Sequence, residues 1–276
     1  MKAPKLSSRK NPRHTLTTAQ WNKVRRLLPP NSKYSPKSRQ HPSRLILNAI
    51  LWVLRTGSPW RDLDSSFPPF QTVHNRFRKW VKLGIFAQIH WKLNQLENDK
   101  NTIDNSQWNL DSTVVRAHKS SSAKNQAIGK SRGGMSSKIH VVTDAQGLIL
   151  NIALTPGQSH EAPIAMKVFN GVRLKTDQWR KQKPEKLACD KAYDSRQIRR
   201  CLQHQKVTPV IPTKKSKRNE RRGRKRKFSK VDYRNRNVVE RAIGRIKEYR
   251  RVATRYEKLD ASFESMIYLA CITAWH

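Results

Sequence analysis

Apolar and polar residues alternate with the period of an α-helix through the N-terminal third of the chain. Trp21, Val24 and Leu28 are three or four residues apart, which places them on one face of a helix. Proline or glycine follows such stretches and ends them. The pattern predicts four helices, at residues 17–28, 44–55, 71–83 and 85–96. The second is apolar nearly all round and is therefore expected to be buried.

After residue 106 the apolar residues form short runs, which indicates β-strands. We expect strands at residues 108–117, 138–143, 148–155, 186–189 and 207–211. The sequence Asp-Ala-Gln-Gly at 144–147 predicts a hairpin turn between the second and third strands. Helices are expected at residues 160–169, 195–205, 234–251 and 263–274. A hairpin followed by alternating helices and strands predicts a mixed α/β domain.

These two patterns predict the domain organisation. We expect a basic, disordered arm at residues 1–16, a helical domain at 17–97, a polar linker at 98–106 and an α/β domain at 107–276. The third helix of the helical domain carries Arg76, Arg78 and Lys79 away from its apolar face. Such a helix is typical of a helix-turn-helix variant that binds the major groove of DNA. A merely solvated helix face is the alternative interpretation, of about equal weight.

The net charge of the chain limits the classes of function that it can have. There are 58 Lys and Arg residues against 19 Asp and Glu, so the net charge is 58 − 19 = +39. Such a charge favours polyanions, above all nucleic acid, and argues against an enzyme that acts on cations. Residues 213–230 hold 11 Lys or Arg in 18 positions, which predicts a flexible basic insertion that lies along phosphates. A nuclear-localisation signal is the competing interpretation of that segment.

Cysteines and apolar segments indicate the compartment. Three cysteines without a C-x-x-C pair argue against a disulfide framework or a zinc ribbon and favour a reducing compartment. The N-terminus has no apolar segment of a secretory signal, and the longest apolar run, residues 45–54, is too short to cross a bilayer. We therefore expect a cytoplasmic protein that does not bind membranes.

Three acidic residues are conspicuous in so basic a chain. Asp111 lies in the first strand and Asp190 ends the fourth, although a helix cap or turn is the commoner role of such an Asp. Glu240 lies beside the buried face of the long helix, where an ion pair with Arg236 is the simpler explanation. Brought together, the three carboxylates would hold hard divalent cations, and two such ions act on phosphodiesters. The residues thus predict metal-dependent chemistry on nucleic acid.

Several motifs in the chain also match a known family. The residues Tyr233, Arg236, Glu240 and Lys247 reproduce the spaced pattern Y-x2-R-x3-E-x6-K. The segments around the two aspartates, 110–118 and 188–195, match as well, as do 57–63, 72–77, 133–140 and 155–158. Over residues 15–275 the chain resembles the bacterial insertion-sequence transposases of the DDE type, in the insertion-sequence-five family.

The resemblance implies a ribonuclease-H-like catalytic domain at 107–276 behind a helical DNA-binding domain. It implies two Mg²⁺ (or Mn²⁺) ions held by Asp111, Asp190 and Glu240, which support cleavage at the ends of the element and strand transfer to target DNA. The other residues of the spaced pattern would contact DNA near the cleaved phosphate: Tyr233, Arg236 and Lys247. The implied partners are double-stranded DNA, as terminal inverted repeats and target, and further copies of the chain in a dimer or higher oligomer. The implied location is the bacterial nucleoid.

Three further residues are expected to be structural, and two alternative functions compete with this interpretation. Asp194 is expected to be a helix N-cap rather than a metal ligand, and His140 and His160 are expected to be structural. The sequence stops at Ala274-Trp275-His276, inside an expected packing helix. A decayed or repurposed transposase that binds the repeats without cleaving them is therefore the main alternative. A structure-specific nuclease ranks last, because it gives no reason for the N-terminal helices.

Overall fold

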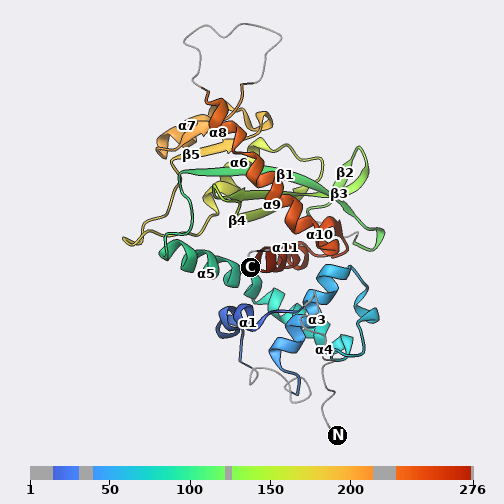
Figure 1. Cartoon of the computed structure of the whole chain (residues 1–276). Helices are drawn as coiled ribbons and strands as arrows, with labels where there is room; N and C mark the ends of the chain where they lie inside the picture. Colours follow the sequence, from blue (N-terminus) through green and yellow to red (C-terminus); the bar gives the residue numbers. More distant parts are fainter. Residues whose placement is uncertain (1–14, 31–39, 122–125, 214–227, 275–276) are drawn as a thin grey trace. The chain divides into compact units, whose positions relative to one another are not determined.

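A computed structural model of the chain describes residues 15–30, 40–121, 126–213 and 228–274 (Figure 1). Its contacts divide the chain into two units. Unit 1 takes its residues from Met1–Leu93, His118–Lys124 and Ile246–His276, and unit 2 from Asn94–Ala117 and Asn125–Arg245. Most of the predicted basic arm and basic insertion, and the last two residues, lie outside the described residues. The predicted domain boundaries follow the sequence order and stay a prediction.

Unit 1 is helical, and the predicted helices are present. It contains α1 (Thr18–Val24) with η1 (Arg25–Leu27), α3 (Ser43–Thr56), η3 (Trp60–Asp62), α4 (Phe70–Lys82), most of α5 (Ile85–Asp99), α10 (Arg250–Ala253) and α11 (Asp260–Ala274). A capping box between Thr17 and Gln20 begins α1. Gly57 ends α3 with a φ of +75°, which glycine adopts without strain. None of the described helices is long and apolar enough to span a membrane.

The helices of unit 1 share one apolar core. As predicted, α3 is buried along most of its length, and it packs against α4, α10 and α11. Arg251 of α10 is also buried, and its guanidinium binds Glu257 Oε1 at 2.6 Å and the Ser58 carbonyl oxygen at 2.7 Å. Residues near the C-terminus thus complete a core that begins with α3.

Unit 2 is built around a mixed sheet. Its strands are β1 (Gln107–Ala117), β2 (Gly129–Ser131), β3 (Gly134–Thr143), β4 (Ile149–Pro156), β5 (Lys186–Cys189) and β6 (Thr208–Val210). Strand β3 pairs antiparallel with β1, β2 and β4, whereas β5 pairs parallel with β1 and β6. The Asp144 amide donates to the Leu148 carbonyl oxygen at 3.0 Å, which closes the predicted hairpin turn. A mixed α/β sheet that follows an N-terminal helical region in the sequence is therefore confirmed.

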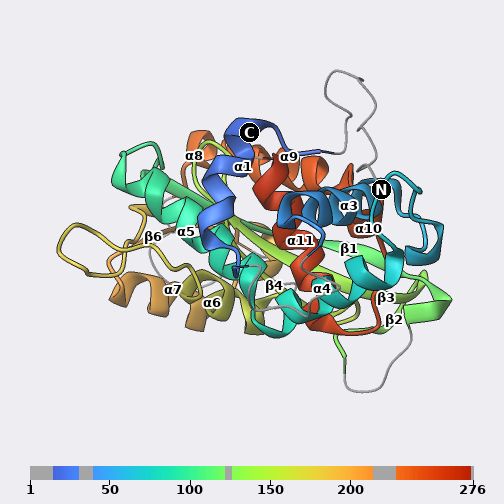
Figure 2. The ribbon, with the colours of Figure 1, turned by 90° about the horizontal axis from the view of Figure 1, so that it is seen from below.

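Helices cover both faces of this sheet. Figure 2 shows α8 (Lys230–Arg234) and α9 (Asn237–Lys247) on one side of the strands, with α6 (Ala162–Asn170) and α7 (Arg196–His204) on the other. The apolar stripe predicted for α9 is buried, as expected: Val239, Ala242, Ile243 and Ile246. The sheet is thus the middle of three layers, and the layer formed by α8 and α9 carries Glu240.

The prediction of a single long helix at residues 234–251 is wrong. The segment is divided into α8, α9 and α10, with breaks after Arg234 and after Lys247. Asn235 caps α8 and Asn237 begins α9, and asparagine side chains compete with helical backbone hydrogen bonds. The apolar period continues across these breaks and therefore concealed them. The short strand β2 was not predicted, because three polar residues give no period.

Candidate active site

Asp111 lies within the longest strand of unit 2, at the point where the strand becomes partly exposed. Residues before it on β1 are buried, and Asp111 faces Val141 of β3 in the antiparallel register. The Ser112 amide donates a hydrogen bond to Asp111 Oδ1 at 2.9 Å. Burial raises the pKa of the Asp111 carboxyl, and the nearby guanidinium of Arg236 opposes this rise. The strand therefore holds a carboxylate whose charge needs a cation beside it.

The sheet register brings Asp190 next to Asp111. Leu110 of β1 is paired with Cys189, the last residue of β5, in a parallel ladder, and each aspartate is the next residue in the chain. Asp190 Oδ1 accepts a hydrogen bond from the Lys191 amide at 2.5 Å, so it caps the short helix η5 (Lys191–Tyr193). The Tyr233 hydroxyl lies 3.5 Å from the same oxygen. Asp190 thus caps a short helix and also lies beside Asp111 in the candidate site.

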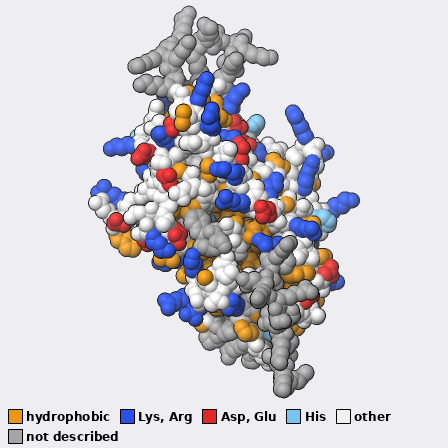
Figure 3. Space-filling view, viewed as in Figure 1, with side chains coloured by type: hydrophobic (Ala, Val, Ile, Leu, Met, Phe, Trp, Pro, Cys, Tyr) orange, Lys and Arg blue, Asp and Glu red, His pale blue; other side chains and the backbone are white. Residues whose placement is uncertain are grey.

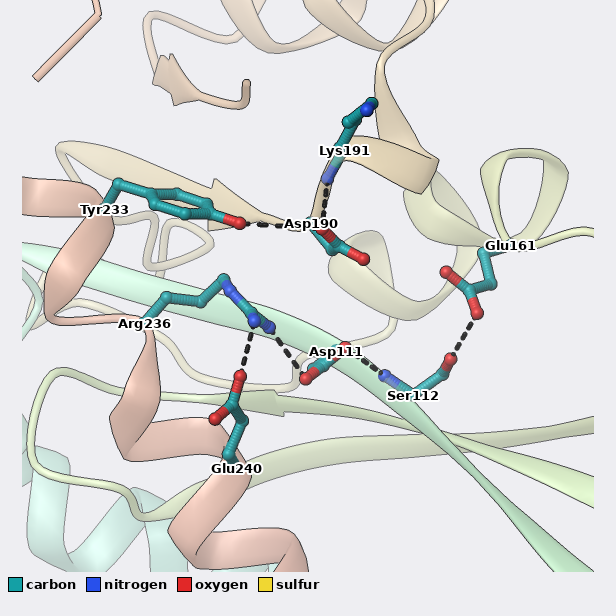
Figure 4. Close-up of polar contacts among 8 residues, drawn as sticks. All are labelled: Asp111, Ser112, Glu161, Asp190, Lys191, Tyr233, Arg236 and Glu240. Atoms are coloured by element: carbon teal, nitrogen blue, oxygen red, sulfur yellow. Dashed lines mark hydrogen bonds and ion pairs between the residues drawn. The ribbon is translucent and has the colours of Figure 1, made fainter. Parts of the chain in front are cut away.

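Arg236 joins the third acidic residue to the first. Its Nη1 lies 2.7 Å from Asp111 Oδ2, and its Nη2 lies 2.5 Å from Glu240 Oε1. Figure 4 shows the guanidinium between the two carboxylates, with the ring of Tyr233 beside it. The predicted ion pair of Arg236 and Glu240 is therefore confirmed, and it is one half of a bridge that links β1 to α9. Charge-assisted contacts of this kind are stronger than neutral hydrogen bonds.

The donor set suits a divalent cation. Asp111 and Glu240 already bind one positive group between them, and carboxylate oxygens are the ligands that Mg²⁺ and Mn²⁺ prefer. In the part of the chain that the structure describes, no three His, Cys, Asp or Glu side chains are close enough together to hold a metal ion. Two of the candidate ligands, Asp111 and Glu240, are linked by the Arg236 guanidinium, which lies between their carboxylates.

Beside Asp111 lies a polar group that the sequence did not reveal. The Ser112 hydroxyl donates to Glu161 Oε1 at 2.8 Å, and Lys138 Nζ lies 3.2 Å from the same oxygen (Figure 4 shows the Ser112 contact). Glu161 is in the loop just before α6, far from Asp111 in sequence, so only the folded sheet brings the two together. The one sequence signal for this group was the segment 133–140, which matches the family and contains Lys138.

Asp194 and His140 of unit 2 take structural positions. The N-cap prediction for Asp194 is wrong: Ser195 is the N-cap of α7, and Asp194 Oδ1 instead binds Arg199 Nε at 2.9 Å. His140 is buried with Nε2 2.9 Å from Thr155 Oγ1, as expected of a structural histidine. Burial, with help from Lys138, lowers the pKa of His140 to about 4. His160 is exposed.

In unit 1 the basic face predicted for α4 needs correction. Arg76 is only 2% exposed and lies 3.5 Å from Ser43 Oγ, so it does not belong to an exposed basic face. It is three residues after Val73 and four before Trp80, and this spacing places it on the buried side of the helix. Arg78 and Lys79 are exposed, as predicted. Lys247 is the last residue of α9, and its predicted contact with DNA stays a prediction.

Family models match both parts of the chain. Residues 109–275 match the model described as "Transposase DDE domain", which is more than half of the sequence. Residues 16–90 match the model described as "Putative transposase of IS4/5 family".

Individual relatives are similar over shorter stretches. The chain is 31% identical over 111 residues to the uncharacterized protein y4sN of Sinorhizobium fredii, a match that covers 40% of this chain and 82% of the relative. It is 29% identical over 141 residues to "Putative transposase for insertion sequence element IS6501" of Brucella ovis, covering 51% of this chain and 98% of the relative.

Solved structures to which the chain is similar include a piggyBac transposase synaptic complex with hairpin DNA. That match has 12% identity and a TM-score of 0.44, and it covers 92% of this chain and 70% of the other. The Mos1 strand transfer complex matches with 12% identity and a TM-score of 0.27, covering 65% of this chain and 60% of the other.

Proposed function

We propose that this chain, which belongs to the family of DDE-domain transposases, catalyses DNA transposition and that Asp111, Asp190 and Glu240 are its catalytic carboxylates. One observation carries this assignment. Asp111 and Glu240, on a strand and a helix far apart in sequence, bind the same guanidinium, and Asp190 directly follows the neighbouring strand, beside Asp111. Acidic side chains gathered at adjacent strands of a very basic chain suit a site that acts on a polyanion.

The three carboxylates would hold two Mg²⁺ or Mn²⁺ ions, which stabilise the attacking and leaving oxygens when a phosphodiester is cleaved. The chain's own residues prepare this site. The Ser112 amide fixes the orientation of the Asp111 carboxylate, and the Lys191 amide fixes that of Asp190. Glu161, which is itself paired with Lys138, accepts a hydrogen bond from the Ser112 hydroxyl and so holds this side chain away from Arg236.

Arg236 has two alternative partners in this proposal. In the free protein it neutralises Asp111 and Glu240. When DNA enters, its guanidinium turns to a backbone phosphate, which accepts two parallel N–H donors as a carboxylate does. Tyr233, beside Arg236, and Lys247, at the end of α9, would contact the DNA near the cleaved bond.

The other partners follow from the same function. We assign recognition of the terminal inverted repeats to unit 1, with Arg78 and Lys79 on the exposed face of α4 as its first candidates. Two ends of one element must be processed together, so the working form is a dimer or a larger assembly on DNA. A net charge of +39 would keep the protein on the bacterial nucleoid.

Cleavage of a duplex that bears one end of the element tests the assignment. The reaction is run with Mg²⁺, with EDTA, and with the Glu240→Gln protein. We expect 3′-OH ends only with Mg²⁺ and the unchanged protein. The matched control is Glu248→Gln, which removes an exposed carboxylate from the same segment and should cleave normally.

Binding of the same duplex is measured in parallel by mobility shift. Glu240→Gln should bind at least as well as the unchanged protein, since it loses a negative charge. Cleavage that persists in Glu240→Gln would refute the assignment of the carboxylates. Tight binding without cleavage by any form would favour the alternative of a non-catalytic protein that occupies the repeats.

A further inference from the structure

A β-hairpin of unit 2 between α6 and β5 has no role in the function proposed above. Lys175 and Lys181 form its bridge, and the Thr176 amide donates to the Arg180 carbonyl oxygen at 2.8 Å. The Trp179 amide donates to the Thr176 carbonyl oxygen, also at 2.8 Å. These bonds define a tight turn over residues 176–179, followed by a bulge at Trp179. Figures 1 and 2 both show this yellow hairpin projecting from the strands of unit 2.

The base of the hairpin is firmly anchored. Val172 and Leu174 are buried, and the backbone of Lys175 is bonded to the second half of α5. Gln95 Oε1 accepts from the Lys175 amide at 2.9 Å, and Asn98 Nδ2 donates to the Lys175 carbonyl oxygen at 3.0 Å. The tip is therefore presented in a defined position.

At the tip, Trp179 is an unfavourable choice for the fold. It has a φ of +60°, in the left-handed region, at the bulge position that glycine or asparagine normally occupies. Trp179 is 79% exposed, more than any other large hydrophobic residue among those that the structure describes. Neither backbone strain nor exposed apolar surface contributes to stability, so the indole is explained better by a contact outside the chain.

The surroundings of Trp179 indicate what that contact is. Between residues 173 and 183 there are five Lys or Arg residues and one acidic residue, Asp177. The ammonium of Lys175 lies 4.9 Å from the centre of the indole ring. Figure 3 shows that Lys and Arg side chains also outnumber acidic ones over the rest of the visible face. A second copy of a chain with a charge of +39 would be repelled here, whereas a nucleic acid would be attracted.

We propose that the hairpin tip is a second DNA-binding site, in which Trp179 stacks on an unpaired or strand-terminal base and the surrounding cations bind the adjacent phosphates. An exposed aromatic ring beside basic residues is the arrangement that binds single strands without sequence preference. Within a duplex the faces of the bases are covered by their neighbours, so the ring needs a base that cleavage or melting has exposed. The proposal rests on the transposase function, because strand cleavage and transfer create such bases.

Binding of labelled oligonucleotides of arbitrary sequence tests the proposal by fluorescence anisotropy, without metal ions. The probes are a single-stranded oligo-dT and a blunt duplex. We expect Trp179→Asn to bind oligo-dT roughly tenfold more weakly and the duplex almost unchanged, since one stacked base contributes that much. Trp179→Phe should keep most of the affinity. Lys175→Gln should reduce the salt dependence by about one counterion.

Asparagine tolerates a left-handed backbone, so Trp179→Asn should fold with an equal or higher melting temperature. Leu259→Asn, which alters another exposed hydrophobic residue, is the matched control and should bind oligo-dT normally. Unchanged binding of oligo-dT by a folded Trp179→Asn protein would overturn the proposal. So would an equal loss of affinity for both probes, or a lower melting temperature, which would make the ring structural. Since neither probe is cleaved, these outcomes are independent of the test of the catalytic carboxylates.

Discussion

Replacement of Arg236 by glutamine should increase the affinity of the free protein for a divalent cation. Arg236 bridges Asp111 and Glu240, at 2.7 Å and 2.5 Å. A metal ion that binds these oxygens must first displace the guanidinium. Glutamine keeps much of the side chain but removes the positive charge, so the carboxylates become available to the ion.

The size of the effect follows from burial. Arg236 and Asp111 have side chains that are 13% and 17% exposed, so their contact is largely protected from water. A hydrogen bond to a charged partner contributes about 1.5–3 kcal/mol under such conditions. The Glu240 side chain is 54% exposed, and its contact adds little. Loss of the competitor should therefore tighten Mn²⁺ binding roughly ten- to hundredfold.

Isothermal titration of Mn²⁺ into the protein without DNA measures this directly. Arg241→Gln removes the same charge from an exposed position on α9 and is the matched control, with only a small expected change. Cleavage of the element's end by Arg236→Gln should fall even though the ion binds more tightly, because the phosphate contact is lost. Unchanged or weaker Mn²⁺ binding by Arg236→Gln would refute the idea that the guanidinium and the ion compete.

Three further predictions concern stability. Glu257→Gln leaves the buried guanidinium of Arg251 without its countercharge. It should lower the free energy of unfolding, measured by urea titration, by about 3 kcal/mol. Loss of the exposed Lys100 charge is the control and should change this free energy by less than about 0.5 kcal/mol. Gly147→Ala should lower the free energy of unfolding by about 1–2 kcal/mol, because φ at this position is +95° and the new Cβ would lie 2.9 Å from Val238. Gly244→Ala, at a position with open space around it, is the control and should not lower this free energy. In the unfolded chain His140 takes up a proton below its ordinary pKa of 6.5, but in the folded chain only below about 4, so stability should fall from pH 6.5 to 4 by about 3 kcal/mol. His140→Gln should show a shallower fall, and an unchanged slope would contradict the assignment.

Local patterns were sufficient to predict most helices and strands. The apolar stripe of α9 is buried as the period required, and the turn at 144–147 closes as its residues indicated. Where charge was weighed above spacing, the prediction was wrong. Arg76 has the spacing of a buried position, and its charge led to the opposite expectation.

The candidate site could be predicted only in part. The spaced pattern pointed to Glu240, and the strand positions pointed to Asp111 and Asp190, but the bridge of Arg236 to Asp111 connects residues 125 positions apart. No periodicity reports such a contact, since it depends on how α9 packs on the sheet. The same holds for Glu161, which reaches Ser112 from a loop that precedes α6.

The composition of unit 1 has a consequence during protein synthesis. Its core combines α3 and α4, which leave the ribosome early, with α10 and α11, which leave it only after unit 2 has been translated. We expect α3 and α4 of a nascent chain to have an open apolar face until α10 and α11 have been translated. A prematurely terminated polypeptide would lack α11 and would be a target for proteases. Repeat recognition by such fragments would then be weak, so translation errors would yield few competitors for the complete protein.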